Sequence, residues 1–350
     1  MAKLMMKGNE AMALAALKGG CKAFFGYPIT PQSELPEYLS RHMKDYGESE
    51  VAAINMVYGA ASAGIRAMTS SSSPGVALKQ EGISYMAGAE LPGVIINVMR
   101  GGPGLGGIQP SQADYKQVTR GGGNGDYYCL AFAPETLQET VDIIKEAFAL
   151  ADLYRNPVMI AVDGLIGQMM EPVDVDRPIP DYDLPEKNWA ANGTMGKRER
   201  NIVNSLYLKP VELEEHSLRL FKKYQTMKEK EQRYEIVNGE DAEIMIVAYG
   251  TMARICRSAI ETLREQGVKV GLLRPISIWP YPEKAFDELS PTVKGLLTCE
   301  LSTGQMIDDV KIANRGRLPI GFFGRTGGML PETEEIVAAV LDMLKELRHE

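Results

Sequence analysis

Cysteine and histidine are scarce in this sequence of 350 residues. It has four cysteines and three histidines, and no two cysteines have the spacing of a CxxC motif. Iron–sulfur clusters usually take closely spaced thiolates, and a zinc site or a Ser-His-Asp triad needs convergent ligands or a partnered histidine. We therefore predict that this chain holds no metal ion and no iron–sulfur cluster. Four cysteines are predicted to be reduced core residues: Cys21, Cys129, Cys256 and Cys299.

The sequence also lacks a basic excess and a long apolar run. Its formal net charge is −8, whereas nucleic-acid binding requires a basic surface. No stretch approaches the roughly 20 apolar residues that span a bilayer. The first ten residues, MAKLMMKGNE, lack the apolar core of a secretory signal. We expect a cytoplasmic protein that binds neither nucleic acid nor a membrane.

Motifs that bind phosphate groups are missing as well. There is no P-loop lysine motif, and no Gly-Asp-Gly followed by paired asparagines, the pattern that binds the pyrophosphate of thiamine diphosphate. Gly102, Gly104 and Gly107 satisfy GxGxxG. However, Pro110 follows almost at once and no acidic residue ends the next strand, so a loop over a pocket is favoured over a dinucleotide site. A phosphorylated cofactor would need another chain to hold its phosphates.

Helical and strand patterns alternate in two parts of the chain, which predicts parallel, doubly wound α/β sheets. In the first part we expect helices at 9–17, from Thr30-Pro31, at 51–65, 74–88 and 135–153, and strands at 22–27, 94–99, 127–132 and 158–162. In the last part we expect strands at 244–249, 268–273, 295–300 and 320–324, and helices at 252–266, 304–314 and 332–348. Between them lie a proline-rich stretch and a charged helix over 210–234. The predicted division is a first domain 1–165, a linker 166–238 and a smaller domain 239–350.

Three polar residues are expected beyond the carboxyl ends of strands, where ligands bind in sheets of this type. Thr30, in GYPITPQSELPEYL, is predicted to begin a helix, as a cap only or as part of an anion site. Glu50 begins an alanine-rich helix, as a first-turn charge or as a functional carboxylate. Arg100 ends an apolar strand beside glycines, a place suited to bidentate binding of a carboxylate. The serines at 70–73 are predicted to cap a strand-to-helix turn.

Several segments together resemble the alpha-type subunit of the 2-oxoacid:ferredoxin oxidoreductases. They are GYPITPQSELPEYL, ESEVAAINMVYGAASAG, NVMRGGPGLGGIQPSQADYKQVTRGGGNGDY, LRPISIWPYP and FGRTGG, in chain order. The resemblance implies that residues 1–165 form the pyrimidine-binding domain of thiamine diphosphate. Residues 239–350 are then similar to the C-terminal domain of transketolase.

The same resemblance implies a hetero-oligomer that shares the cofactor. The expected partners are a beta-type subunit with the pyrophosphate domain, a gamma-type subunit and a ferredoxin-like iron–sulfur subunit. Mg²⁺ and the iron–sulfur clusters are expected in those partners. Coenzyme A is the expected co-substrate, and an external ferredoxin is the expected electron acceptor.

Roles for the three residues follow from the resemblance. Glu50 matches the glutamate that hydrogen-bonds the aminopyrimidine ring, where a carboxylate favours the imino tautomer needed for attack on a keto carbon. Thr30 matches a threonine near the substrate and cofactor, and Arg100 is expected to bind the substrate carboxylate. The implied reaction is oxidative decarboxylation of a 2-oxoacid to the acyl-CoA, CO₂ and reduced ferredoxin. The length and the run GGIQPSQADY resemble the branched-chain type, which acts on 3-methyl-2-oxobutanoate.

Other substrates and other functions stay open on the sequence. A 2-oxoglutarate site needs a second cation, for which the loop offers Lys116 and Arg120. A branched-chain site needs apolar walls, for which Leu105 and Ile108 are candidates. Pyruvate is a third substrate to weigh. The alternative functions are a half-subunit of a non-redox thiamine-diphosphate decarboxylase or transketolase, and a catalytically silent structural subunit.

Overall fold

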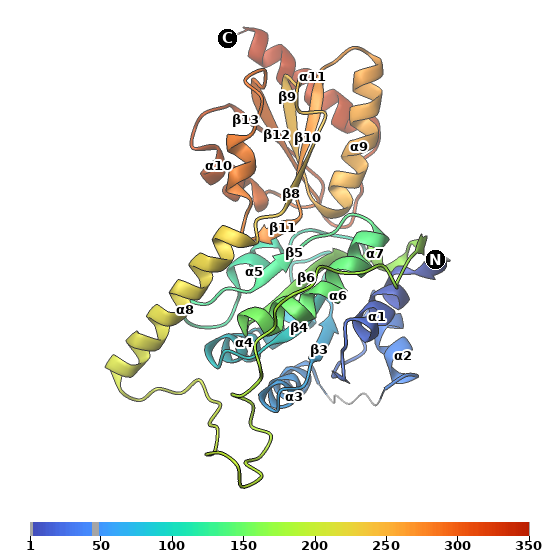
Figure 1. Cartoon of the computed structure of the whole chain (residues 1–350). Coiled ribbons are helices and arrows are strands. Elements are labelled where there is room, and N and C mark those ends of the chain that lie inside the picture. The colour runs from blue at the N-terminus through green and yellow to red at the C-terminus, as the bar shows by residue number, and fades with distance from the viewer. Residues whose placement is uncertain (1–2, 44–48, 350) are drawn as a thin grey trace.

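Two sheets, one above the other in Figure 1, organise the chain. A computed structural model describes residues 3–43 and 49–349. Within them, a six-stranded sheet and a five-stranded sheet are accompanied by a two-stranded ribbon. The ribbon pairs β1 (Leu4–Lys7) with β7 (Met170–Val173) in antiparallel fashion.

The first sheet is built around strands that are buried on both faces. Its order is β11-β5-β6-β4-β3-β2, and each neighbouring pair is parallel except β11 with β5. The central strands β4 (Gly93–Met99) and β6 (Pro157–Asp163) are buried along their whole length, as their apolar sequences favour. The other strands are β2 (Ala23–Phe24), β3 (Ala67–Ser71), β5 (Leu130–Phe132) and β11 (Ser277–Trp279). The predicted α/β fold with a doubly wound parallel sheet is confirmed.

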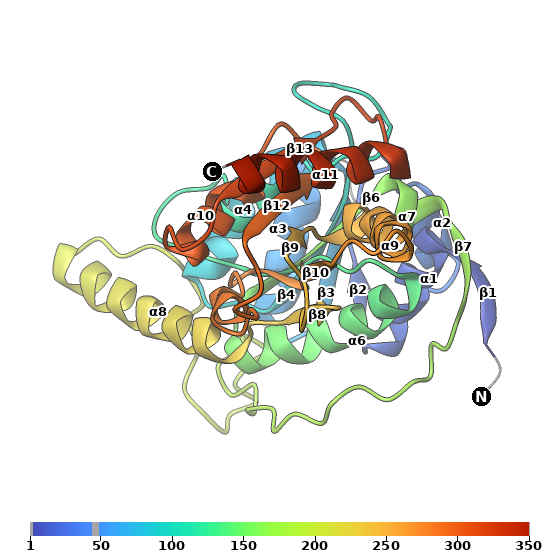
Figure 2. The same cartoon turned by 90° about the horizontal axis from the view of Figure 1, so that it is seen from above.

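Helices cover both faces of this sheet (Figure 2). The first helix packs against the sixth, and the third against the fourth. The helices are α1 (Gly8–Lys18), α2 (Glu34–Ser40), α3 (Glu50–Ser62), α4 (Ser73–Gly88), α5 (Tyr115–Arg120), α6 (Leu137–Tyr154) and α7 (Gly164–Gln168). Small residues let α3 and α4 approach closely, since a Cβ at Gly82 would lie 2.6 Å from a methyl group of Ile54.

The second sheet has the order β13-β12-β9-β10-β8, with β8 as an antiparallel edge strand. Its strands are β8 (Tyr234–Val237), β9 (Ile244–Val247), β10 (Val270–Pro275), β12 (Gly295–Glu300) and β13 (Ile320–Gly324). Its helices are α9 (Gly250–Glu265), α10 (Met306–Asn314) and α11 (Thr333–His349), with a short 3₁₀ helix at Glu283–Asp287. An apolar cluster between the sheet, α9 and α11 forms a core of its own.

A long helix, α8 (Pro210–Lys230), lies along the side of the molecule and projects beyond its edge (Figure 2). It ends four residues before the predicted helix because Tyr234 already begins β8. The predicted linker 166–238 also contains β7, and β11 of the first sheet comes from the predicted last domain. The domain division at 165 and 239 remains a prediction.

Buried hydrogen bonds join the two sheets. The side chain of Gln112 donates to the Tyr249 carbonyl at 2.8 Å and accepts from the Leu301 amide at 2.9 Å. The Tyr115 hydroxyl donates to Asp309 at 2.6 Å. The loop that follows β4 is therefore anchored to the second sheet.

The predicted helix start at Thr30-Pro31 is wrong. Helix α2 begins at Glu34 after Ser33, so Thr30 is not its N-cap. A helix from Pro31 would place Pro36 in its interior, where its missing N–H could not donate to the Gln32 carbonyl. Starting at Glu34 places Pro36 in the first turn, which tolerates proline.

Candidate active site

Glu50 is the first residue of α3, and its carboxylate is buried. The Ser49 hydroxyl oxygen accepts a hydrogen bond from the Ala52 amide at 3.1 Å and caps the helix. One oxygen of Glu50 accepts a hydrogen bond from the Ser71 hydroxyl at 2.6 Å, at the carboxyl end of β3. The other oxygen forms an ion pair with Lys79 of α4. Because Glu50 is only 5% exposed, protein groups and not solvent surround its carboxylate.

Lys79 is the buried cation of this site. Its side chain is fully buried between the two helices. Burial lowers the pKa of the Lys79 ammonium to about 7, while the carboxylate in contact with it favours the charged form. Lys79 and Glu50 therefore hold compensating charges out of water, the condition under which buried charges are tolerated.

Gly75 lets the carboxylate lie directly against the backbone of α4. A Cβ at Gly75 would overlap the Ser71 hydroxyl and would lie 2.9 Å from the carboxylate carbon of Glu50. Gly75 and Lys79 are four residues apart, so they share one face of α4. This face and the end of β3 form a cradle around the carboxylate, which we call the Glu50 cradle: Ser71, Gly75 and Lys79.

Arg100 follows β4 and connects two loops. Its guanidinium donates to the Thr30 carbonyl at 2.8 Å and to the Leu105 carbonyl at 3.0 Å. Its backbone pairs with Pro110, which closes the glycine loop 101–109. The side chain is buried, and its Nε has no hydrogen-bond partner among the residues that the structure describes. Two of five N–H groups are used, so the fork retains donors for a carboxylate.

Thr30 lies in the loop between β2 and α2. Its carbonyl accepts from Arg100, and the residue is exposed. The next residue, Pro31, is buried, and its carbonyl accepts from the side chains of Asn9 and Gln168 at 2.8 and 3.1 Å. The loop is thus held from both sides, and Thr30 is presented beside the guanidinium of Arg100.

The ends of neighbouring strands bring the three predicted residues to one edge of the sheet. Strands β3 and β4 pair in register, with Ser71 beside Asn97. Ser73, which begins α4, has a hydroxyl that accepts from the Arg100 amide at 2.9 Å. Glu50 meets Ser71 and Arg100 meets Ser73, so both border the turn from β3 to α4.

Sequence reasoning missed the residues that hold this turn. The serines were expected to cap amides, and the Ser73 hydroxyl does accept from the Arg100 amide. The hydroxyls of Ser70, Ser71 and Ser73 also donate to the side chains of Gln32, Glu50 and Asp114. Asp114 also accepts from Asn97 at 3.0 Å, and burial raises the pKa of Asp114. Gln80 and Glu81 follow Lys79 directly, so no local pattern marked this lysine as buried.

The candidate specificity residues lie in and after the glycine loop. Leu105 and Ile108 are exposed at 82% and 54%. Lys116 pairs with Asp308 at 2.8 Å, and Arg120 pairs with Asp309. Both cations of α5 are therefore engaged by acidic residues of α10.

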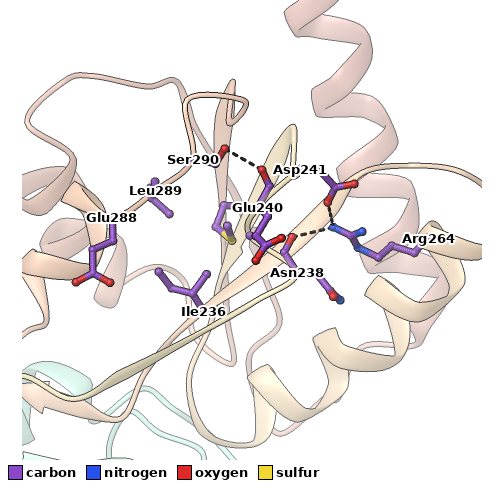
Figure 3. A pocket seen from close by; sticks show the side chains of 10 residues that line it. Ile236, Asn238, Glu240, Asp241, Arg264, Glu288, Leu289 and Ser290 are labelled. Atoms are coloured by element: carbon purple, nitrogen blue, oxygen red, sulfur yellow. Dashed lines mark hydrogen bonds and ion pairs between the residues drawn. The ribbon is translucent and has the colours of Figure 1, made fainter.

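Two cavities lie away from the Glu50 cradle. One, of about 840 Å³, opens at the edge of the second sheet beside β8 and α9 (Figure 3). There Arg264 bonds Asp241 at 2.8 Å and the Asn238 carbonyl at 2.8 Å. The other, of about 630 Å³, lies between α8 and the stacked rings of Tyr128 and Trp279. Neither is lined by Thr30, Glu50 or Arg100.

Within residues 3–43 and 49–349, no helix has both the length and the apolar character needed to cross a membrane. No three side chains of His, Cys, Asp or Glu in the same ranges are grouped so that they could hold a metal ion.

Two family models match the sequence. Residues 14–235 match the thiamine-diphosphate-binding model of pyruvate flavodoxin/ferredoxin oxidoreductases. Residues 242–336 match core domain II of pyruvate:ferredoxin oxidoreductase. Together the two models cover both sheets.

Curated relatives match over nearly the whole chain. Ketoisovalerate oxidoreductase subunit VorB from Methanothermobacter marburgensis is 47% identical over 99% of each chain. The 2-oxoglutarate synthase subunit KorA from Methanothermobacter thermautotrophicus is 33% identical over 97% of this chain and 98% of its own length.

Solved structures share the fold. The 2-oxoglutarate:ferredoxin oxidoreductase from Magnetococcus marinus, with 2-oxoglutarate, coenzyme A and succinyl-CoA bound, superposes with a TM-score of 0.86 at 26% identity. The match covers 97% of the present chain, which spans only 65% of that longer chain. A split-gene transketolase, 16% identical, superposes with a TM-score of 0.59 and shares the fold alone.

Proposed function

Since this chain belongs to the 2-oxoacid:ferredoxin oxidoreductase family, we propose that it is the subunit that supplies the pyrimidine-side carboxylate for thiamine diphosphate. The complete enzyme would convert a 2-oxoacid, coenzyme A and oxidised ferredoxin to the acyl-CoA, CO₂ and reduced ferredoxin. The observation that carries the proposal is the buried carboxylate of Glu50 in its cradle of Ser71, Gly75 and Lys79.

The residues present fit the pyrimidine end of this cofactor. An ionised carboxylate offers about four acceptor positions, and Ser71 and Lys79 engage one on each oxygen of Glu50. The remaining positions can accept a hydrogen bond from a protonated ring nitrogen. Thiamine diphosphate, when bound, supplies the nucleophile and the electron sink for decarboxylation. Glu50 would orient the ring and hold the proton at its nitrogen.

Arg100 and Thr30 are proposed to bind the acid end of the substrate. The free donors of Arg100 suit a carboxylate, and the Thr30 backbone carbonyl bonds the same guanidinium. The glycine loop held by Arg100 would limit the access of water to the reacting carbon. Each 2-oxoacid has a carboxylate next to its keto group, so these residues do not select among side chains.

Partner subunits are part of the proposal. The sequence has no Gly-Asp-Gly motif for the pyrophosphate and no cysteine cluster. We assign the pyrophosphate domain with Mg²⁺ to a beta-type partner, and the iron–sulfur clusters to a ferredoxin-like partner. A gamma-type subunit, coenzyme A and an external ferredoxin complete the assembly, which we place in the cytoplasm.

We propose 3-methyl-2-oxobutanoate and related branched acids as the preferred substrates. A 2-oxoglutarate site needs a second cation, and the two candidate cations of α5 are already paired with Asp308 and Asp309. Leu105 and Ile108 leave apolar side chains on the loop that Arg100 holds. The 47% identity to a ketoisovalerate oxidoreductase subunit supports the same choice.

Initial rates of the assembled enzyme with 3-methyl-2-oxobutanoate, pyruvate and 2-oxoglutarate test the proposed substrate preference. We expect 3-methyl-2-oxobutanoate to have the highest kcat/KM and pyruvate to be slower. Each methylene in an apolar pocket contributes about 1–3 kcal/mol, so the preference should reach roughly 10–200-fold. The highest kcat/KM with 2-oxoglutarate would overturn this choice, and would direct attention to Lys116 and Arg120.

The same preparation separates the alternative functions. A non-redox decarboxylase or transketolase half-subunit would not copurify with a chain that carries cysteine clusters. A silent structural subunit would leave turnover unchanged when Glu50 is replaced.

A further inference from the structure

We propose that Lys79 is a positioning residue that keeps Glu50 ionised and aimed at the cofactor ring. This inference rests on the proposed function of Glu50 and adds a residue to it. Lys79 lies on α4, whereas Glu50 begins α3, so the pair joins the two helices that cover one face of the sheet.

The recorded polar contact of the Lys79 ammonium is with Glu50. Its side chain has no exposed surface, and the ion pair with Glu50 is the polar contact that the structure records for its ammonium within the described residues. Gly75, one turn earlier, brings the carboxylate within reach. An apolar side chain of similar length would fill the same space without burying a charge.

Stability alone does not account for the pair. Replacing a buried ion pair with well-packed apolar residues is often neutral or stabilising, because desolvation of two charges offsets their attraction. The pair therefore needs another reason, and the protonation state of Glu50 provides one. Burial without a counter-charge favours the neutral carboxylic acid, whereas an adjacent ammonium favours the carboxylate.

Among residues 3–43 and 49–349, the other groups in contact with Glu50 do not provide this charge. From β3, the Ser71 hydroxyl contributes a neutral donor. From α4, Gly75 contributes only backbone. Asp114, which precedes α5, accepts hydrogen bonds from Ser73 and Asn97 instead. Lys79 is therefore the cation that the described residues place against the Glu50 carboxylate.

Lys79→Met in the assembled enzyme tests the proposal, with Lys145→Met as matched control. Lys145 is also a buried lysine, but its ammonium bonds the carbonyls of Val175 and Arg177. Two quantities are measured across pH: the Kd of thiamine diphosphate by calorimetry, and kcat. In Lys79→Met we expect the acidic limb of both pH profiles to shift to higher pH by about 1–3 pH units. Cofactor binding near pH 7 should weaken about tenfold or more, and should recover as the pH rises.

The control and a double variant decide the outcome. Lys145→Met should not shift the acidic limb of either pH profile. Acidic limbs at the same pH in Lys79→Met and Lys145→Met would overturn the proposal. In a Glu50→Gln background, Lys79→Met should add no further shift, because Lys79 acts through Glu50. That double variant removes both charges, so it remains informative if Lys79→Met alone does not fold. A further loss of cofactor binding in the double variant would also overturn the proposal. If Glu50→Gln alone changes neither Kd nor kcat, the proposed function has failed, not the role of Lys79 alone.

Discussion

Glu50→Gln is expected to lower the turnover of the assembled enzyme by about 10²–10⁴-fold, the contribution of a positioned acid–base group. The amide keeps the shape of the side chain but cannot carry the negative charge that holds a proton at the cofactor ring. The measurement is kcat for reduction of ferredoxin with saturating 2-oxoacid and coenzyme A. Glu81→Gln is the matched control, because Glu81 lies on α4 and its exposed carboxylate accepts from the Tyr85 hydroxyl. Near-normal turnover of Glu50→Gln would return Glu50 to a structural role.

The same substitution should make stability depend on pH in a defined direction. It leaves Lys79 buried without its counter-charge, and burial already lowers the pKa of Lys79 from 10.5 to about 7. In the unfolded chain the lysine binds its proton up to about pH 10.5, so the unfolded state holds more protons between about pH 7 and 10.5. Stability of Glu50→Gln should therefore rise with pH across that window. Thermal unfolding at pH 7 and 9 measures this rise, and a fall would contradict it.

Arg100→Ala is expected to weaken all 2-oxoacids together. Truncating one partner of a buried, hydrogen-bonded charge pair costs about 2–5 kcal/mol, which corresponds to a loss of roughly 30- to 5000-fold in kcat/KM. The loss should be similar for 3-methyl-2-oxobutanoate, pyruvate and 2-oxoglutarate, because they share the carboxylate next to the keto group. The kcat/KM of Arg100→Lys should lie between those of Arg100→Ala and the unsubstituted enzyme, since lysine keeps the charge but not the planar fork.

Arg66→Ala provides the control for Arg100. Arg66 precedes β3 at the opposite end of the strand, where it bonds Asp152 and the Gly19 carbonyl at 2.8 Å each. Its loss should reduce stability and leave kcat/KM unchanged. A loss in Arg100→Ala that is confined to one acid would contradict a shared carboxylate site, and would indicate that Arg100 acts through the loop that carries Leu105.

Much of the fold follows from local patterns in the sequence. β4 and β6 are continuous apolar runs, and the charged helix α8 buries Leu220, Tyr224 and Met227 at a helical spacing. Pairings between distant segments were not predicted. The strand β11 joins the first sheet through β5, and β1 pairs with β7, although more than 140 residues separate each pair. Short edge strands have too little periodicity to reveal such partners.

The candidate site could be predicted only in part, because some of its residues meet through the packing of distant segments. Thr30, Glu50 and Arg100 follow strands or begin helices, so their place at one edge of the sheet could be expected from topology. Their chemical roles remain predictions. Lys79 lies 29 positions beyond Glu50 in the sequence, and only the packing of α3 on α4 brings the two together. The helix predicted from Thr30 is wrong because Pro36, six residues later, is tolerated only in the first turn of a helix.

The most direct test compares this chain alone with the reconstituted complex. The measurement is reduction of ferredoxin that depends on both 3-methyl-2-oxobutanoate and coenzyme A, in the presence of thiamine diphosphate and Mg²⁺. The chain alone should bind the cofactor weakly, show no cluster absorbance and give no ferredoxin reduction. Activity should appear when subunits with the pyrophosphate domain and the iron–sulfur clusters are added. Full oxidoreductase activity from the chain by itself would contradict the account.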